Sequence, residues 1–439
     1  MQLSPERLKG LAAAELVQLS EEGVDTSELQ ALHDAAVGGP PGQVADALES
    51  FFSRAAAAAP AADFPYSEPS DLPGIRAARR DGQRRMTLSQ AQADNRIRGA
   101  WLGRCAGCML GKPVEGWTKD QIEAVLKHAG EYPLDDYFPP IADLPEGLRA
   151  YHSSDTLRGN IAYGVRDDDT DYTLLGLHIL EAHGPDFTPD NVAAEWLGRL
   201  PYDQVYTAER EAYRNLVMDI RPPQSALVMN PYREWIGAQI RCDGFAYGAA
   251  GRPERAAEYA WRDAVVSHVK NGIYGEMYFA AAIAAAMATD SLQEALAAGR
   301  AEIPDNCRLA EAVDDTLAWC AEDGDWQATW RRMDQKYGHY HPVHTINNAV
   351  IVILACLHAE GDLGRAICIA VMGGLDTDCN GATAGSLMGA LLGAEAVAGK
   401  WVDPLNDTLY SALQGMNENS ITDLARRSLQ TAKSSGVWG

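Results

Sequence analysis

The apolar stretches of this 439-residue chain are built largely on small residues. Residues 257–288 and 347–374 are long apolar runs, and they lack the regular alternation of β-branched and polar residues that predicts strands. Between residues 381 and 393, glycine and alanine recur at three- and four-residue spacing, which lets helix backbones approach closely. These patterns predict an all-α protein whose helices pack tightly.

The amino-acid composition changes along the chain in a way that predicts three parts. Residues 1–54 read as an N-terminal helical extension, because Ser4-Pro5-Glu6-Arg7 is a strong helix start. Residues 55–75 are rich in Ala and Pro and predict an extended linker. Residues 76–439 then form one large helical domain.

The charge balance excludes several classes of partner. The chain has 37 Lys and Arg against 61 Asp and Glu, a formal net charge of −24. Such a chain should bind neither nucleic acid nor an anionic membrane surface, and an anionic substrate would need a cation between it and the protein. No secretory signal or membrane span is visible, and the eight cysteines are scattered. We therefore expect a cytoplasmic protein with reduced thiols.

Two acidic clusters are the strongest chemical signals. Asp167, Asp168, Asp169 and Asp171 precede a run with helical apolar spacing, and 376–378 reads Asp-Thr-Asp before the small-residue helix. An Asp-rich helix start usually caps the helix, and that interpretation suffices for either cluster alone. Two such clusters together favour a metal site, and their oxygen ligands suit hard cations such as Mg²⁺ or Mn²⁺.

Four stretches in order resemble one known family, the ADP-ribosylglycohydrolases, which include dinitrogenase-reductase-activating glycohydrolases and ADP-ribosylarginine hydrolases. Together these stretches span about residues 95–400, so the first 75 residues or so lie outside the resemblance. They are 96–103 with 111–115, then 168–170, then Asp243-Gly244 with Ser267-His268, and finally 373–378.

The resemblance implies a compact domain of orthogonally packed helices and a site with two Mg²⁺ ions, or Mn²⁺ instead. By position it assigns metal binding to the two acidic clusters and catalysis to the acid that ends the first stretch. The implied metal ligands are Asp167, Asp168, Asp169, Asp376, Asp378 and Cys379, and the implied catalytic residues are Glu115, Asp168 and Asp169.

The chain departs from the family pattern at three positions. Asp167 and Cys379 stand where many relatives have Thr or Ser, and Cys108 stands where many have Asp. A thiol is a poor ligand for Mg²⁺. Either one metal loses a ligand, or the metal is softer, or a backbone carbonyl or water substitutes for the hydroxyl.

The hypothesis for function is a metal-dependent hydrolase that cleaves an N-glycosidic bond at ribose C1. Its substrate would be an ADP-ribosylated protein or a small ADP-ribosyl conjugate. Glu115 is the first choice for the general base, with Asp168 or Asp169 as alternatives. The residues expected to bind substrate are Asp243, Gly244, His268 and Gly374.

Two other functions stay open at this stage. One is a hydrolase of an unusual nucleoside or nucleotide, which the cysteines at 108 and 379 favour. The other is a non-catalytic ADP-ribose-binding or structural protein, which the retained aspartates argue against. The sequence leaves the oligomeric state undetermined.

Overall fold

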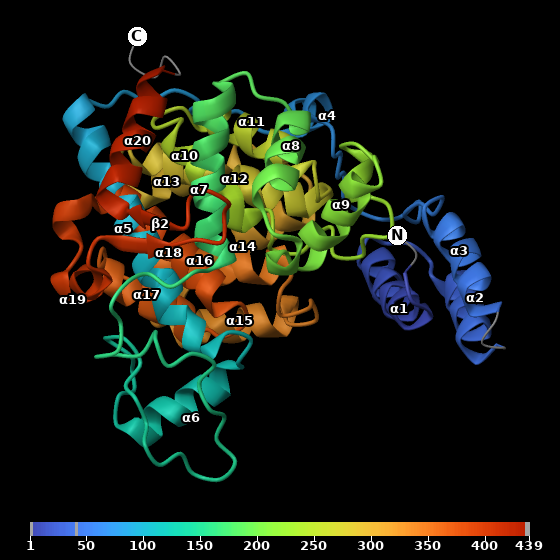
Figure 1. Cartoon of the computed structure of the whole chain (residues 1–439), viewed down its shortest axis with the longest axis horizontal. Helices are drawn as coiled ribbons and strands as arrows, with labels where there is room; N and C mark the ends of the chain where they lie inside the picture. The colour runs from blue at the N-terminus through green and yellow to red at the C-terminus, as the bar shows by residue number, and fades with distance from the viewer. Residues whose placement is uncertain (1–2, 40–42, 435–439) are drawn as a thin grey trace.

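The computed structural model describes residues 3–39 and 43–434, so residues 1–2 and 40–42 of the predicted extension and 435–439 of the predicted main domain lie outside the described residues. A large body of packed helices carries a small helical unit at one side (Figure 1). Within the described residues the only strands are β1 (Thr408–Tyr410) and β2 (Glu418–Ser420), an antiparallel pair. The predicted all-α class is confirmed.

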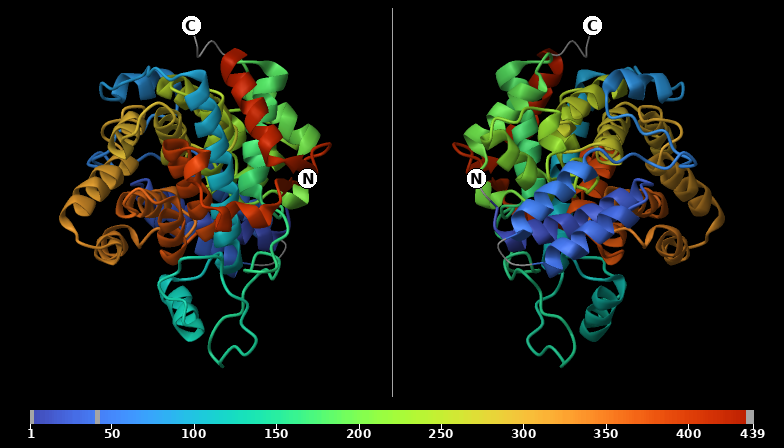
Figure 2. Two further views of the ribbon diagram at one scale, coloured as in Figure 1. Left: turned by 90° about the vertical axis from the view of Figure 1, so that its left-hand side faces the viewer. Right: turned by 90° about the vertical axis from the view of Figure 1, so that its right-hand side faces the viewer.

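In its described residues, the N-terminal unit has three α-helices and a hydrophobic core of its own that includes Leu48 and Phe51. It docks on the large domain through its first helix, where buried Arg233 forms ion pairs of 2.8 Å with both Glu15 and Glu22. Figure 2 (right) shows its helices lying side by side on this face. They are α1 (Pro5–Glu21), α2 (Ser27–Gly38) and α3 (Val44–Ala55).

The segment between the unit and the domain is extended but fixed to the domain surface. Residues 59–70 contain no helix or strand, and α4 (Leu72–Ala78) follows. Glu68 forms a 2.7 Å ion pair with Arg308, and the Trp261 indole donates a hydrogen bond to the Ser70 carbonyl at 2.9 Å. The Ala/Pro-rich stretch therefore holds the N-terminal unit in place.

Helices make up most of the remaining chain (Figure 1). The first half has α5 (Gln90–Gly111), α6 (Lys119–Ala129), α7 (Asp168–His183), α8 (Pro189–Arg199), α9 (Thr207–Val217) and α10 (Cys242–Tyr247). The second half has α11 (Pro253–Ala264), α12 (Lys270–Ala286), α13 (Leu292–Arg300), α14 (Arg308–Glu322), α15 (Trp326–Tyr337), α16 (Thr345–His358), α17 (Leu363–Met372), α18 (Thr377–Leu392), α19 (Gly399–Val402) and α20 (Ile421–Ser434). Short 3-10 helices lie at Lys112–Val114, Tyr202–Gln204, Gln224–Ala226, Gln239–Arg241, Ala394–Ala396 and Asp403–Leu405.

Both long apolar runs of the sequence are broken by turns. The first divides into α11 and α12, and the second into α16 and α17. Helix α12 is buried along almost its whole length, which explains why it is apolar on every side.

The small-residue spacing produces an unusually close pair of helices, α5 and α18. Glycines at every fourth position of α5 face α18, and a Cβ atom at Gly103 or Gly107 would lie less than 3.0 Å from the α18 backbone. The reverse holds for Gly381 and Gly385 of α18 against α5. This contact brings the end of α5 to the start of α18, where the second acidic cluster lies.

Seven of the eight cysteines are buried, Cys320 is half-buried, and none is paired in a disulfide. None of the helices in the described part of the chain is both long and apolar enough to cross a membrane.

Candidate active site

Two helix N-termini and one loop converge on a single acidic centre. Asp167 caps α7, Asp376 precedes α18, and Glu115 follows the 3-10 helix that extends α5. Ligand atoms of Glu115, Asp376 and Asp378 lie within 4.8 Å of one another, as do those of Asp169, Asp378 and Cys379. The structure therefore unites the two acidic clusters.

The first cluster is the start of α7. The Asp167 carboxylate accepts a hydrogen bond from the Asp169 amide at 3.0 Å, so capping occurs as expected. The three carboxylates of 167–169 also lie within 4.8 Å of one another. Capping and a metal site are thus compatible here, because the cap uses only one oxygen of Asp167 and no carboxylate oxygen of Asp168 or Asp169.

Lys112 explains how the extra carboxylate at position 167 is tolerated. Its ammonium group forms a close ion pair with Asp167. Although burial opposes ionisation, this cation lowers the pKa of Asp167 below its usual range. The additional negative charge is therefore balanced within the protein.

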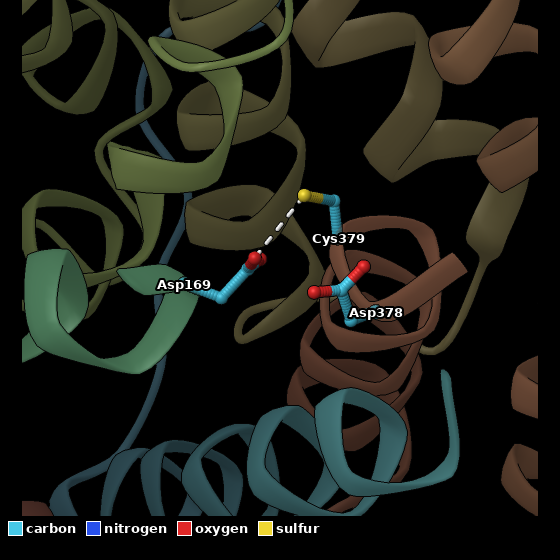
Figure 3. A group of neighbouring side chains, drawn as sticks. All are labelled: Asp169, Asp378 and Cys379. Atoms are coloured by element: carbon cyan, nitrogen blue, oxygen red, sulfur yellow. Dashed lines mark hydrogen bonds between the residues drawn. The ribbon is translucent and has the colours of Figure 1, made fainter. Parts of the chain in front are cut away.

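Cys379 bridges the two clusters. Figure 3 shows its thiol directed at Asp169, to which it donates a 3.1 Å hydrogen bond, with Asp378 beside it. Burial, with Asp169 and the other carboxylates nearby, holds the pKa of this thiol well above its usual range. Among the described residues, Oδ1 of Asp378 is buried and has no hydrogen-bond partner.

The surroundings of the other acids of the centre disfavour the ionised form of their carboxyl groups. Burial and the neighbouring carboxylates hold the pKa values of Asp168 and Asp378 well above their usual range. Burial, Asp376 and Asp167 together raise the pKa of Glu115 to about 7. Oxygen ligands that repel one another, one of them without a partner, fit a divalent cation, whose charge would relieve the repulsion.

A cavity of about 450 Å³ opens onto this centre. Glu115, Asp167, Asp168, Asp376, Asp378 and Cys379 all line it. The rest of the lining comes from Lys112, Arg166, Tyr206, Thr207, Glu209, Ile236, Gly237, Ile240 and Val343.

The residues expected to bind substrate do not line this cavity. Asp243 is buried and forms a 2.7 Å ion pair with Arg104, and Gly244 packs against the backbone of α7. His268 is buried in the turn between α11 and α12. Gly374 takes a φ of +75° against the 117–119 backbone, which only glycine fits readily.

Several residues of the centre were not recognised in the sequence. Buried Arg104 donates hydrogen bonds to the Asp169 side chain (3.2 Å) and backbone (2.8 Å), and so ties α5 to α7. The Oδ1 atom of Asn348 accepts hydrogen bonds from the amide of Asp376 (3.2 Å) and the side chain of Asn380 (2.7 Å). Isolated arginine and asparagine residues such as these belong to no recognisable sequence motif, and only the fold brings them to the site.

The comparison with family models shows to which protein family the chain belongs. The model for ADP-ribosylglycohydrolase matches residues 89–435, most of the chain. The chain belongs to the ADP-ribosylglycohydrolase family. The resemblance inferred from four short stretches is thereby confirmed, and membership makes this protein a glycosidic hydrolase.

A solved structure described as an ADP-ribosylglycohydrolase-related protein complex is similar to this glycohydrolase. It is 20% identical, covers 79% of this chain and 99% of its own, and superposes with a TM-score of 0.48. No curated protein matches the chain. The family match begins at residue 89, so α1, α2 and α3 lie outside it.

Proposed function

We propose that this glycohydrolase uses divalent cations to cleave the N-glycosidic bond at ribose C1 of an ADP-ribosylated protein or small ADP-ribosyl conjugate. The observation that carries the proposal is the convergence of Glu115, the 167–169 cluster and the 376–379 cluster on one cavity. Two Mg²⁺ ions, or Mn²⁺, suit the oxygen ligands.

The carboxylates divide into two roles in this proposal. Asp168, Asp169, Asp376 and Asp378 would hold the cations, which supply positive charge for ribose hydroxyls and make a water molecule more acidic. Glu115 lines the cavity and has a pKa of about 7, which suits a general base near neutral pH.

The remaining charges support the same chemistry. Positive charge develops at ribose C1 as the bond to the leaving group breaks, and nearby carboxylates stabilise it. Lys112 keeps the buried Asp167 ionised and balances its charge, so the other carboxylates of the centre would supply the negative field. Arg166, which lines the same cavity, is anchored by a 2.8 Å ion pair with Asp171.

Turnover by the purified full chain tests the proposal. Protein stripped with EDTA and then supplied with Mg²⁺ or Mn²⁺ is incubated with ADP-ribosylarginine, O-acetyl-ADP-ribose and simple ribonucleosides. We expect metal-dependent release of ADP-ribose. Asp376→Ala should lower turnover by about 10²-fold or more, since it removes a charge at the reacting centre. Exposed Asp190→Ala is the matched control.

Turnover of ribonucleosides alone would replace this proposal with the nucleoside hydrolase alternative. No turnover of any substrate with either cation would contradict it. Full activity of Asp376→Ala would show that the acidic centre is not the active site.

A further inference from the structure

A second cavity, of about 530 Å³, adjoins the candidate active site. Tyr206 and Thr207 line both cavities, so the two meet at the start of α9. One wall of the second cavity is the beginning of α1, with Leu3, Ser4 and Arg7. The N-terminal unit, which lies outside the family match, therefore builds part of a pocket next to the acidic centre.

The position of this wall is set by buried contacts. Arg233 of the domain pairs with Glu15 of α1 and with Glu22 just after it, and the side-chain amide of Gln18 donates to Glu234 at 2.9 Å. These residues are buried, and breaking charge pairs of this kind is costly. The α1 wall is thus a fixed part of the pocket.

The second cavity carries an available positive charge at Arg210. Its guanidinium lies 4.7 Å from the centre of the Tyr202 ring and donates a 3.5 Å hydrogen bond to the Val205 carbonyl. Within the described parts of the chain, no carboxylate lies within ion-pairing distance of Arg210. An anionic ligand in the cavity would supply that partner.

The one acid in the lining does not cancel this charge. Glu211 forms close ion pairs with both Arg7 and the buried Arg214. Among the described residues, the charged side chains that line the cavity are Arg7, Arg210 and Glu211, so the lining carries a net positive charge. In a protein with a net charge of −24, such a region marks a place for an anion.

Aromatic side chains complete the lining. Tyr202, Tyr206 and Tyr232 all line the cavity, and Tyr206 is 45% exposed. The Tyr232 ring packs edge-on against the Trp235 ring, with ring centres 4.7 Å apart. Rings beside guanidinium groups suit a ligand that joins a flat base to a phosphate.

We propose that this second cavity binds the nucleotide end of the ADP-ribosyl group, with α1 completing the subsite. The inference rests on the proposed function, which places ribose C1 at the acidic centre. The shared wall of Tyr206 and Thr207 would then lie along the diphosphate. The N-terminal unit thereby selects substrates that carry a nucleotide.

Calorimetric titration of AMP into the full chain in EDTA tests the subsite without any metal. We expect Arg210→Gln on α9 and Arg7→Gln on α1 each to weaken AMP binding about tenfold, the usual effect of losing one charge-assisted contact. Arg54→Gln, on the exposed face of α3, is the control and should bind AMP normally. Mn²⁺ affinity should be the same in all four proteins.

Enzyme kinetics provide a second measurement, which distinguishes the loss of the subsite from a loss of folded structure. With an ADP-ribosyl substrate, Arg210→Gln should raise KM about tenfold and change kcat little. AMP that fails to bind the wild-type chain, or binds both variants normally, would overturn the subsite. A failed proposal of function would look different, since AMP would still bind while no substrate was hydrolysed.

Discussion

The thiol of Cys379 lies 3.1 Å from Oδ2 of Asp169, so a sulfur atom joins the two acidic clusters where a hydroxyl is usual in the family pattern. Sulfur favours softer cations than oxygen does. The centre should therefore discriminate less in favour of Mg²⁺ than an all-oxygen site would.

Replacing Cys379→Ser should shift metal preference toward Mg²⁺. We expect the ratio of the Mg²⁺ to the Mn²⁺ dissociation constant to fall about tenfold, because a hard hydroxyl replaces the thiol. Calorimetry on metal-stripped protein measures both constants. Cys320→Ser, at a half-buried cysteine away from the centre, serves as the control. An unchanged ratio would mean that Cys379 does not contact the cation.

Asp378→Asn should stabilise the metal-free protein while abolishing its response to metal. The variant removes a buried carboxylate that is crowded by Glu115, Asp167 and the other acids. We expect the melting temperature in EDTA to rise by a few degrees, about 1 kcal/mol of unfolding free energy. Added Mn²⁺ should then raise it no further, whereas it stabilises the wild-type chain and Asp190→Asn. A variant that melts lower in EDTA would contradict the role given to Asp378.

Stability without metal should fall between pH 5 and pH 8. The folded-state pKa of Glu115 is raised to about 7 from an ordinary value of 4.5, so the folded chain binds more protons than the unfolded chain across this range. Its contribution to stability is therefore present below pH 4.5 and is lost as the pH rises through 7. Thermal melts in EDTA should show a smaller decline for Glu115→Gln than for the wild-type chain. Equal declines would exclude Glu115 as a source of the effect.

Much of the site was predictable because its residues are close in sequence. The acids of 167–169 and 376–378 stand at helix starts, where local patterns are readable. Lys112 and Arg104 could not be predicted, because an isolated cation acquires its partner only through tertiary packing. Asp243 was expected to bind substrate, and nothing in the sequence indicated that the fold would pair it with Arg104 in the core.

Gly385→Ala should disrupt the α5–α18 contact. The new methyl group would collide with the Gly103 backbone, which has no room to move, and we expect a loss of about 3 kcal/mol of unfolding free energy. Gly198→Ala, on α8 with no atom within 4 Å of the added Cβ, should instead stabilise by about 0.5–1 kcal/mol. Chemical denaturation measures both. Similar effects at the two sites would refute the close contact.

The interlocked glycines also limit how the acidic centre can move. Because the backbones of α5 and α18 are in contact, we expect Glu115, Asp376 and Asp378 to move together as one rigid body. The 167–169 cluster lies at the start of α7, and Arg104 of α5 donates hydrogen bonds to Asp169 within it. We therefore expect any movement that admits or releases a cation to occur between α7 and the α5–α18 pair, across the contacts of Arg104, Lys112 and Cys379 with the 167–169 cluster.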